Sequence, residues 1–107
     1  MTYQVIIIQD AEDDLFEIYR YIFEHDSEQS ANYVLNSLEE LCNSLDQMPQ
    51  RGHVPPELSR ISVSNYLEVH FKPYRVIYEI EEKKVFIHCV LDGRRDLQQL
   101  LERRLLR

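Results

Sequence analysis

The most restrictive feature of the sequence is an apolar stripe in the first half of the chain. Apolar residues recur there at spacings of three and four: Ala31, Val34, Leu35, Leu38, Leu41, Cys42, Leu45 and Met48. This period predicts an amphipathic helix with one buried face. Pro49 ends the predicted helix, because a proline disfavours helical backbone in the residue before it. A chain with such a helix must provide a second apolar surface to cover the stripe.

A strand and another helix are expected before this stripe. Residues 3–8 are rich in β-branched side chains, and we predict a strand that is buried on both faces. Asp10 is a favourable N-cap for a helix over residues 11–24, where apolar side chains again recur at helical spacing. Asp26 or Ser27 is expected to cap the second helix. The first half therefore predicts a strand followed by a helical hairpin.

The second half of the chain predicts a sheet. Residues 49–64 contain three prolines and one glycine, which indicates an ordered loop over one edge of that sheet. Strands are expected over residues 66–71, 74–81 and 85–91, and their short connections suit antiparallel hairpins. After Gly93, leucines at helical spacing predict a short terminal helix: Leu97, Leu100, Leu101, Leu105 and Leu106.

This order of elements is typical of an α+β protein. We expect one domain over residues 1–107, with the helical hairpin packed on a mostly antiparallel four-stranded sheet and a short helix at the C-terminus. A chain of this length buries roughly two thirds of its unfolded surface. That is enough for a stable hydrophobic core without disulfides or a structural metal ion. Cys42 and Cys89 lie in apolar segments and outside any CxxC motif, so we interpret them as reduced core residues rather than a disulfide or ligand pair.

Charge and hydropathy limit where the protein acts and what it binds. The net charge is −7, but residues 1–48 hold eleven acids and one base, whereas residues 49–107 hold eight acids and eleven bases. The halves therefore carry −10 and +3, and this segregation keeps both nucleic acid and acidic proteins open as partners. No apolar run is long enough for a signal peptide or a membrane span, so a soluble, cytoplasmic protein is expected.

Residue spacing gives no sign of a metal or cofactor site. The acids of residues 10–17 are explained by a helix N-terminus and a solvated face, because no histidine or cysteine stands beside them at ligand spacing. The histidines are scattered along the chain. His70 and His88 lie on predicted strands, and the sequence does not require a serine or cysteine nucleophile to lie near the side chain of either. We interpret these two histidines as structural or surface residues, and we expect neither metal nor cofactor.

The arginines of the second half are more informative. Arg75 is predicted to lie on one side of its strand, opposite Tyr74, and Arg94 and Arg95 follow the last strand. An arginine in such a position is either a solvated charge or a bidentate ligand for phosphate or carboxylate. Together with interleaved tyrosines, these arginines predict a surface for a polyanion or a peptide, without deciding between them.

Four segments of the chain resemble the RelE/ParE superfamily of bacterial toxins from type II toxin-antitoxin modules. Residues 11–15 (AEDDL) are similar to its opening helix, and residues 49–52 (PQRG) with 56–58 (PEL) to its loop after the second helix. Residues 74–78 (YRVIY) are similar to the central strand, and residues 93–96 (GRRD) to a ParE-like ending. The four segments occur in the family's order over nearly the whole chain.

The resemblance implies a toxin that a cognate antitoxin, encoded beside it, neutralises by laying a segment across its surface. We expect that antitoxin to carry a DNA-binding N-terminal domain. RelE-like members cleave messenger RNA in the ribosome with basic residues and often a histidine or tyrosine near the chain end. ParE-like members lack that set and typically poison DNA gyrase.

The residues at the end of the chain favour the ParE-like branch. Cleavage of RNA through its own 2′-hydroxyl needs a base, an acid and positive charge at the phosphate. Arg75 matches the strand arginine of the nucleases, but residues 91–95 (LDGRR) contain no histidine or tyrosine. We therefore expect inhibition of DNA gyrase by binding, without enzymatic chemistry.

The expected binding residues lie around the last strand and the terminal helix: Tyr74, Arg75, Arg94, Arg95, Leu97 and Leu101. On this interpretation Arg75→Ala weakens toxicity without unfolding the domain. One alternative is a ribosome-dependent endoribonuclease, which would use His70, Arg75, His88 and Arg95. Another is a degenerate toxin that only binds its antitoxin.

Overall fold

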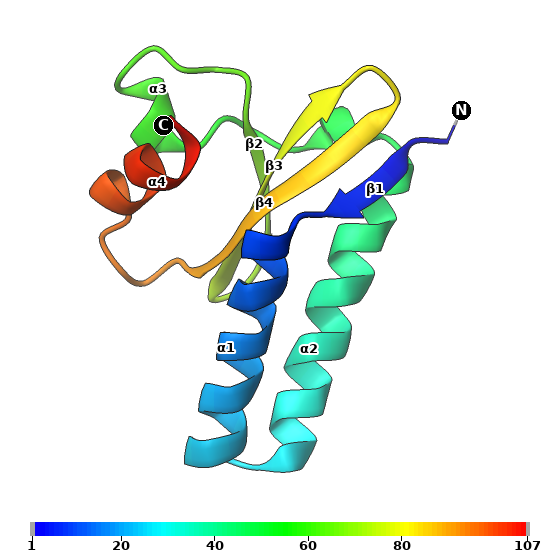
Figure 1. Ribbon diagram of the computed structural model, residues 1–107, viewed down its shortest axis with the longest axis vertical. Helices are drawn as coiled ribbons and strands as arrows, with labels where there is room; N and C mark the ends of the chain where they lie inside the picture. Colours follow the sequence, from blue (N-terminus) through cyan, green and yellow to red (C-terminus); the bar gives the residue numbers. More distant parts are fainter. Residues whose placement is uncertain (1, 107) are drawn as a thin grey trace.

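The protein forms a four-stranded sheet with helices on both faces, as seen in a computed structural model that describes residues 2–106 (Figure 1). The elements in chain order are β1 (Gln4–Ile7), α1 (Gln9–His25), α2 (Glu28–Asn43), α3 (Pro56–Ser59), β2 (Leu67–Phe71), β3 (Tyr74–Glu81), β4 (Lys84–Asp92) and α4 (Gln98–Leu105). Two short 3-10 turns, Ser44–Asp46 and Pro49–Arg51, lie between α2 and α3. The predicted α+β class with a helical hairpin and a terminal helix is confirmed.

The strands are ordered β1-β4-β3-β2, with β1 parallel to β4 and the other two pairs antiparallel. β4 contains a bulge, because Ile77 pairs with Cys89 whereas Tyr78 pairs with Ile87. His88 is therefore an extra residue in β4, and the side chains beyond it change faces. As a result Ile87 and Val90, three residues apart, both face the helical hairpin.

The first strand differs from its prediction. β1 lies at an edge of the sheet and pairs only with β4, so Gln4 is exposed and the other three residues are half-buried, instead of all being buried on both faces. The prediction was wrong because a run of β-branched residues does not reveal whether a strand has one neighbour or two. β1 nevertheless joins the sheet next to the longest strand.

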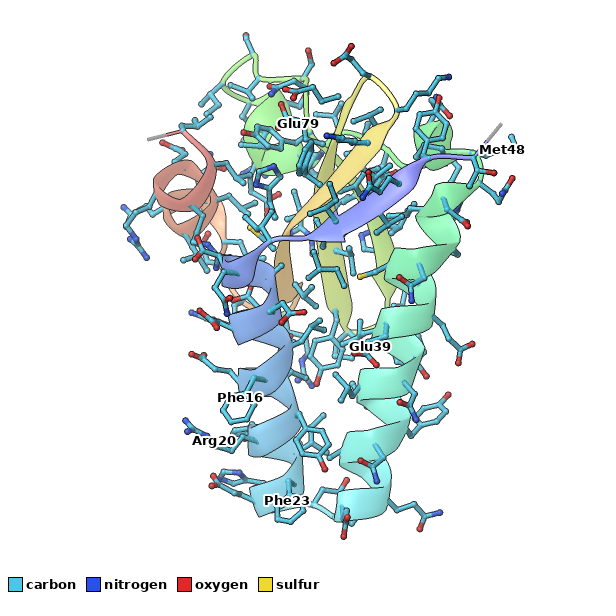
Figure 2. All side chains as sticks on the ribbon, turned by 45° about the vertical axis from the view of Figure 1, so that its right-hand side comes forward. Phe16, Arg20, Phe23, Glu39, Met48 and Glu79 are labelled. Carbon is cyan, nitrogen blue, oxygen red and sulfur yellow. The ribbon has the colours of Figure 1, made fainter. Side chains whose placement is uncertain are left out.

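One face of the sheet packs against α1 and α2, which run side by side and extend past the end of the sheet (Figure 1). The fully buried contacts come from Ala11 and Leu15 of α1, from the α2 stripe, and from β3 and β4. The stripe is confirmed from Ala31 to Leu45, but Met48 is 73% exposed. Met48 has a left-handed backbone (φ 50°) after the helix has ended, which turns its side chain into solvent (Figure 2).

The other face of the sheet packs against α3 and α4. Its buried side chains are Leu58, Tyr66, Ile77, Cys89, Leu91, Leu97 and Leu101. Tyr66 also donates a hydrogen bond from its hydroxyl to the Leu105 carbonyl at 3.1 Å. Both cysteines are buried and unpaired, Cys42 in the first core and Cys89 in the second, as predicted.

Helix ends follow local chemistry only in part. Ser27 caps α2, because its hydroxyl oxygen accepts the Ser30 N–H at 3.0 Å, which confirms one of the two predicted caps. Asp10, by contrast, is not an N-cap: α1 begins at Gln9, two residues before its predicted start, and Ile8 is at the N-cap position. Among residues 2–106, none of the helices combines the length and the apolar character that crossing a bilayer demands.

An ion pair joins the two ends of the chain. Arg104 of α4 donates to both carboxylate oxygens of Asp14 in α1, at 3.0 and 3.2 Å, and to the carbonyl of His88 at 3.0 Å. Asp14 also accepts the Val90 N–H at 2.9 Å. Asp14 is thus partly buried and connects α1 with β4 and α4. The prediction that the acids of this helix are explained by the helix N-terminus and a solvated face is wrong for Asp14.

Candidate functional site

Two adjoining hollows form a groove between the helical hairpin and the end of the sheet, which we call the hairpin groove. One has a volume of about 740 Å³ and lies between the outer half of α1 and the end of β4. The other, about 830 Å³, lies between the start of α2 and the β2–β3 turn. Four residues line both hollows: Ile22, Asp26, Tyr74 and Arg94. The groove is therefore continuous, with Tyr74 and Arg94 at its centre.

The predicted residues Tyr74, Arg94 and Arg95 all line this groove. Arg94 is held by Asp92: Nε donates to Oδ1 at 3.0 Å and Nη2 to Oδ2 at 2.8 Å. This bidentate contact lowers the pKa of the Asp92 carboxyl. Arg95 is exposed, and within residues 2–106 its side chain has no hydrogen bond or ion pair, although its charge contributes to the lowered pKa of Asp92. Arg95 is thus available to a partner.

Tyrosines give the groove an amphipathic lining. Burial raises the pKa of Tyr74, so its hydroxyl stays protonated and can donate a hydrogen bond at neutral pH. Tyr21 is 63% exposed and stacks on His25 with ring centroids 4.1 Å apart, and Tyr33 is 64% exposed at the other end of the groove. Such rings are typical anchors in protein interfaces.

The charge of the groove is mixed. The first hollow is lined by five acidic side chains and three arginines: Asp14, Glu17, Glu24, Asp26 and Asp92, with Arg20, Arg94 and Arg95. A surface that follows a nucleic-acid backbone needs a continuous excess of positive charge. The hairpin groove has no such excess and fits a protein segment with charges of both signs better.

Arg75 is not part of this groove. Its side chain is 12% exposed and lies between two carboxylates on the face covered by α3 and α4. Nη1 and Nη2 donate to Glu57 at 2.8 Å each, while Nε and Nη2 donate to Glu68 at 2.6 and 3.2 Å. Sequence alternation placed Arg75 on the correct face, but the geometry shows an arginine already occupied by its own chain. It holds α3 against the sheet, which replaces the expected role in target recognition.

The ion pairs of Arg75 with Glu57 and Glu68 make the free energy of unfolding depend on pH in the acidic range. Hydrogen bonds from Arg75 lower the pKa of Glu57 below the ordinary value of 4.5. A depressed pKa in the folded state stabilises the protein above the unfolded value, and this contribution is lost as pH falls through the folded value. We expect Glu57→Gln to lower the free energy of unfolding at pH 7 and to flatten its fall below about pH 4.5, as measured by urea titrations. Glu24→Gln, at an exposed carboxylate, should change neither. Identical pH profiles for Glu57→Gln and the unaltered protein would contradict this assignment.

Leu97 and Leu101 were also predicted as binding residues, but they lie in the interior of the domain. Both are 0% exposed in the core beneath α4. Because no atom of either side chain reaches solvent, they cannot touch a partner on the folded protein, and the prediction that they do is wrong. Helical spacing identifies the face of α4 that is buried, but it does not say whether the domain itself or a partner buries that face.

The four residues of the alternative nuclease set are not brought together. His70 lies opposite Arg75 in the β2–β3 pairing. His88 instead contacts Glu79, four residues further along β3, with Nε2 3.3 Å from the Glu79 Oε1. Arg95 lies beyond the end of β4 in the hairpin groove. The described residues therefore do not assemble these side chains around one phosphate.

A cluster that the sequence did not suggest lies beside Arg75. His53, from the loop before α3, and His70 both place Nε2 at 3.3 Å from the Glu68 carboxylate. His53 and Glu68 are joined by an isolated β-bridge that no spacing rule predicts. Their separation in the chain hid this constellation from sequence reasoning.

Comparison with known proteins gives the family. Residues 5–97 match the family described as the ParE toxin of the type II toxin-antitoxin system parDE. The chain belongs to the ParE toxin family. Its class is therefore that of type II toxins, and the resemblance to the RelE/ParE superfamily is confirmed. Among curated proteins, none matches the sequence significantly.

Two solved structures share the fold of this ParE family member. The chromosomal ParDE toxin-antitoxin system from P. aeruginosa has a TM-score of 0.71 and 16% sequence identity, over 85% of this chain and 96% of that chain. The RelBE2 toxin-antitoxin complex from Mycobacterium tuberculosis has a TM-score of 0.64 and 21% identity, over 86% of this chain and 92% of that chain. At these identities the likeness is one of fold.

Proposed function

We propose that this ParE family toxin inhibits DNA gyrase by binding it, and that a cognate antitoxin neutralises the toxin. The observation that carries the proposal is the family match over residues 5–97, together with the separation of the residues that a nuclease would need. The mixed charge of the hairpin groove also supports a protein target over RNA. The toxin needs no chemistry of its own in this mechanism.

Tyr74, Arg94 and Arg95 are the contact residues in this proposal. They line one groove, and two hydrogen bonds to Asp92 fix the orientation of the Arg94 guanidinium. Arg75 acts as a positioning residue, because its guanidinium is occupied by Glu57 and Glu68. Leu97 and Leu101 lie in the core beneath α4 and are not contact residues in this proposal.

The antitoxin is proposed as a second partner, on the basis that the two similar structures are described as a toxin-antitoxin system and a toxin-antitoxin complex. We expect it to be encoded beside the toxin and to carry a DNA-binding N-terminal domain. Copurification of the toxin with the product of the adjacent reading frame tests this point.

Growth and transcript integrity distinguish gyrase inhibition from endoribonuclease activity and from a degenerate toxin. The chain is expressed without its neighbouring reading frame, and growth and messenger RNA ends are followed after induction. Growth arrest with intact transcripts is the expected result. Arrest with transcripts cut at ribosome-dependent positions would replace gyrase inhibition with endoribonuclease activity. Unimpaired growth with soluble, folded protein would indicate a degenerate toxin that only binds its antitoxin.

A further inference from the structure

Two histidines and a buried glutamate converge on the face of the sheet opposite the helical hairpin. The His53 and His70 side chains are 60% and 38% exposed, whereas the Glu68 side chain between them is 2% exposed. The nitrogen and oxygen atoms that these three residues offer all lie within 4.8 Å of one another. Neither the hairpin groove nor the family membership accounts for this arrangement.

Backbone pairing places the three side chains together. The His53 N–H donates to the Glu68 carbonyl at 3.2 Å, and the Glu68 N–H donates to the His53 carbonyl at 2.8 Å. His70 follows Glu68 by two residues on β2, so both side chains point to the same face of the sheet. The backbone of the loop before α3 is therefore paired with β2 at the position where the three side chains meet.

The distances suit a tetrahedral metal ion. His53 Nε2 is 3.3 Å from Glu68 Oε2, and His70 Nε2 is 3.3 Å from Glu68 Oε1. Ligand bonds of about 2.0 to 2.1 Å at a tetrahedral zinc ion separate neighbouring ligand atoms by about 3.4 Å. The two distances end on different oxygens of Glu68, so a side chain has to rotate before one carboxylate oxygen and both nitrogens can bind the same ion.

Arg75, which Glu57 holds in place, orients the Glu68 carboxylate and neutralises its negative charge only in part. Arg75 donates from Nε to Glu68 Oε1 at 2.6 Å and is itself clamped by Glu57. Hydrogen bonds of this kind fix the orientation of a ligating carboxylate. Two carboxylates share one guanidinium, so Glu57, Glu68 and Arg75 carry a net charge of −1. Arg60 offsets part of it at Glu57, and Glu68, whose Oε2 also accepts from Arg75 Nη2 at 3.2 Å, is the carboxylate that faces the two histidines.

We propose that His53, Glu68 and His70 form a binding site for one divalent transition metal ion, for which zinc is the best fit. Two imidazole nitrogens and one carboxylate oxygen are a donor set that zinc accepts, with a fourth position left to water. The exposure of both histidines gives the ion a path from solvent. The bound ion ties the loop before α3 to β2 and stabilises the folded chain by linkage.

Zinc binding to the untagged full-length protein tests the site. Calorimetric titration with zinc chloride is expected to show one saturable equivalent and a rise in the thermal unfolding midpoint. His53→Gln and His70→Gln should each weaken zinc binding by at least about tenfold and abolish the shift in midpoint. Because both histidines are substantially exposed, the metal-free variants should unfold at nearly the same temperature as the unaltered protein. Substitution with cobalt should give the visible absorption of a tetrahedral ion.

His88→Gln is the matched control. Its Nε2 is also 3.3 Å from a glutamate oxygen, in Glu79, but the described residues place no second histidine there. Zinc affinity should be unchanged in this variant. The proposal is overturned if the unaltered protein binds no zinc, if both His53→Gln and His70→Gln bind it as tightly as before, or if His88→Gln weakens binding equally, which would indicate adventitious surface binding only.

Discussion

Replacing Arg75 with alanine is expected to destabilise the domain by about 3 to 5 kcal/mol, the cost of breaking a buried ion pair by removing one partner. The Glu57 and Glu68 side chains are 14% and 2% exposed, so Glu57 would lose the partner of its ion pair and Glu68 would keep only His53 and His70, each at 3.3 Å. Chemical denaturation at pH 7 measures the loss. Because small domains are stable by only about 5 to 15 kcal/mol, this loss is a large fraction of the total stability and should clearly lower the unfolding midpoint.

Arg94→Ala is the matched control for this prediction. Arg94 also donates two N–H groups to one carboxylate, but its side chain is 72% exposed, and water replaces the lost contact. Its unfolding midpoint should remain that of the unaltered protein. Equal stability of the two variants would contradict a structural role for Arg75. The interpretation from sequence alone expected Arg75→Ala to weaken toxicity without unfolding the domain, whereas the paired carboxylates lead us to expect a loss of stability.

Leu101→Glu is expected to cost more than about 3 kcal/mol and to detach α4 from the sheet. Leu101 is 0% exposed and packs among apolar side chains of the core on the α3 and α4 face, where a carboxylate finds no partner. Loss of α4 would also free Asp14 from Arg104. Thermal unfolding followed by circular dichroism measures the effect.

Leu106→Glu provides the comparison on the same segment. Leu106 lies just after α4 and is 43% exposed, so a charge there stays in water. Its unfolding midpoint should differ little from that of the unaltered protein. If Leu101→Glu unfolds at the same temperature as Leu106→Glu, α4 does not contribute to the core as described.

Local patterns predicted the elements, and their success has a physical basis. The α2 stripe and the alternation of β3 report which side of each element is apolar, and the side of β3 that carries Arg75 was predicted correctly. Ser27 was among the expected caps because hydroxyl side chains satisfy the free N–H groups at a helix start. These properties depend on residues a few positions apart.

Long-range partners explain what the sequence did not predict. Arg75 meets Glu57 from α3 and Glu68 from β2, and no local pattern distinguishes this arginine from one that faces solvent. The bulge at His88 moves Val90 to the opposite face from the one that simple alternation assigns. The convergence of His53 on Glu68 depends on a β-bridge between a loop and an edge strand. Contacts of this kind arise only when the whole chain is folded.

The aromatic residues on the outside of α1 also show that a local pattern does not reveal what a helix face packs against. Phe16, Arg20 and Phe23 lie along one outer side of this helix (Figure 2), and the Arg20 guanidinium carbon is 5.8 Å from the centroid of the Phe16 ring. Phe23 is one of the apolar residues that recur at helical spacing in α1, yet it is 48% exposed. The hairpin extends past the sheet, so the outer turns of α1 have less of the domain to pack against (Figure 1).

Supercoiling by purified DNA gyrase tests the central claim most directly. The unaltered toxin is expected to inhibit supercoiling or to trap cleavage complexes, whereas a double variant with Arg94→Glu and Arg95→Glu, verified as folded by its unfolding midpoint, should inhibit at least about tenfold less because charge is reversed at the contact surface. Addition of the cognate antitoxin should restore gyrase activity. Unchanged supercoiling in the presence of excess folded toxin would contradict gyrase as the target, and full inhibition by the double variant would contradict the hairpin groove as the contact surface.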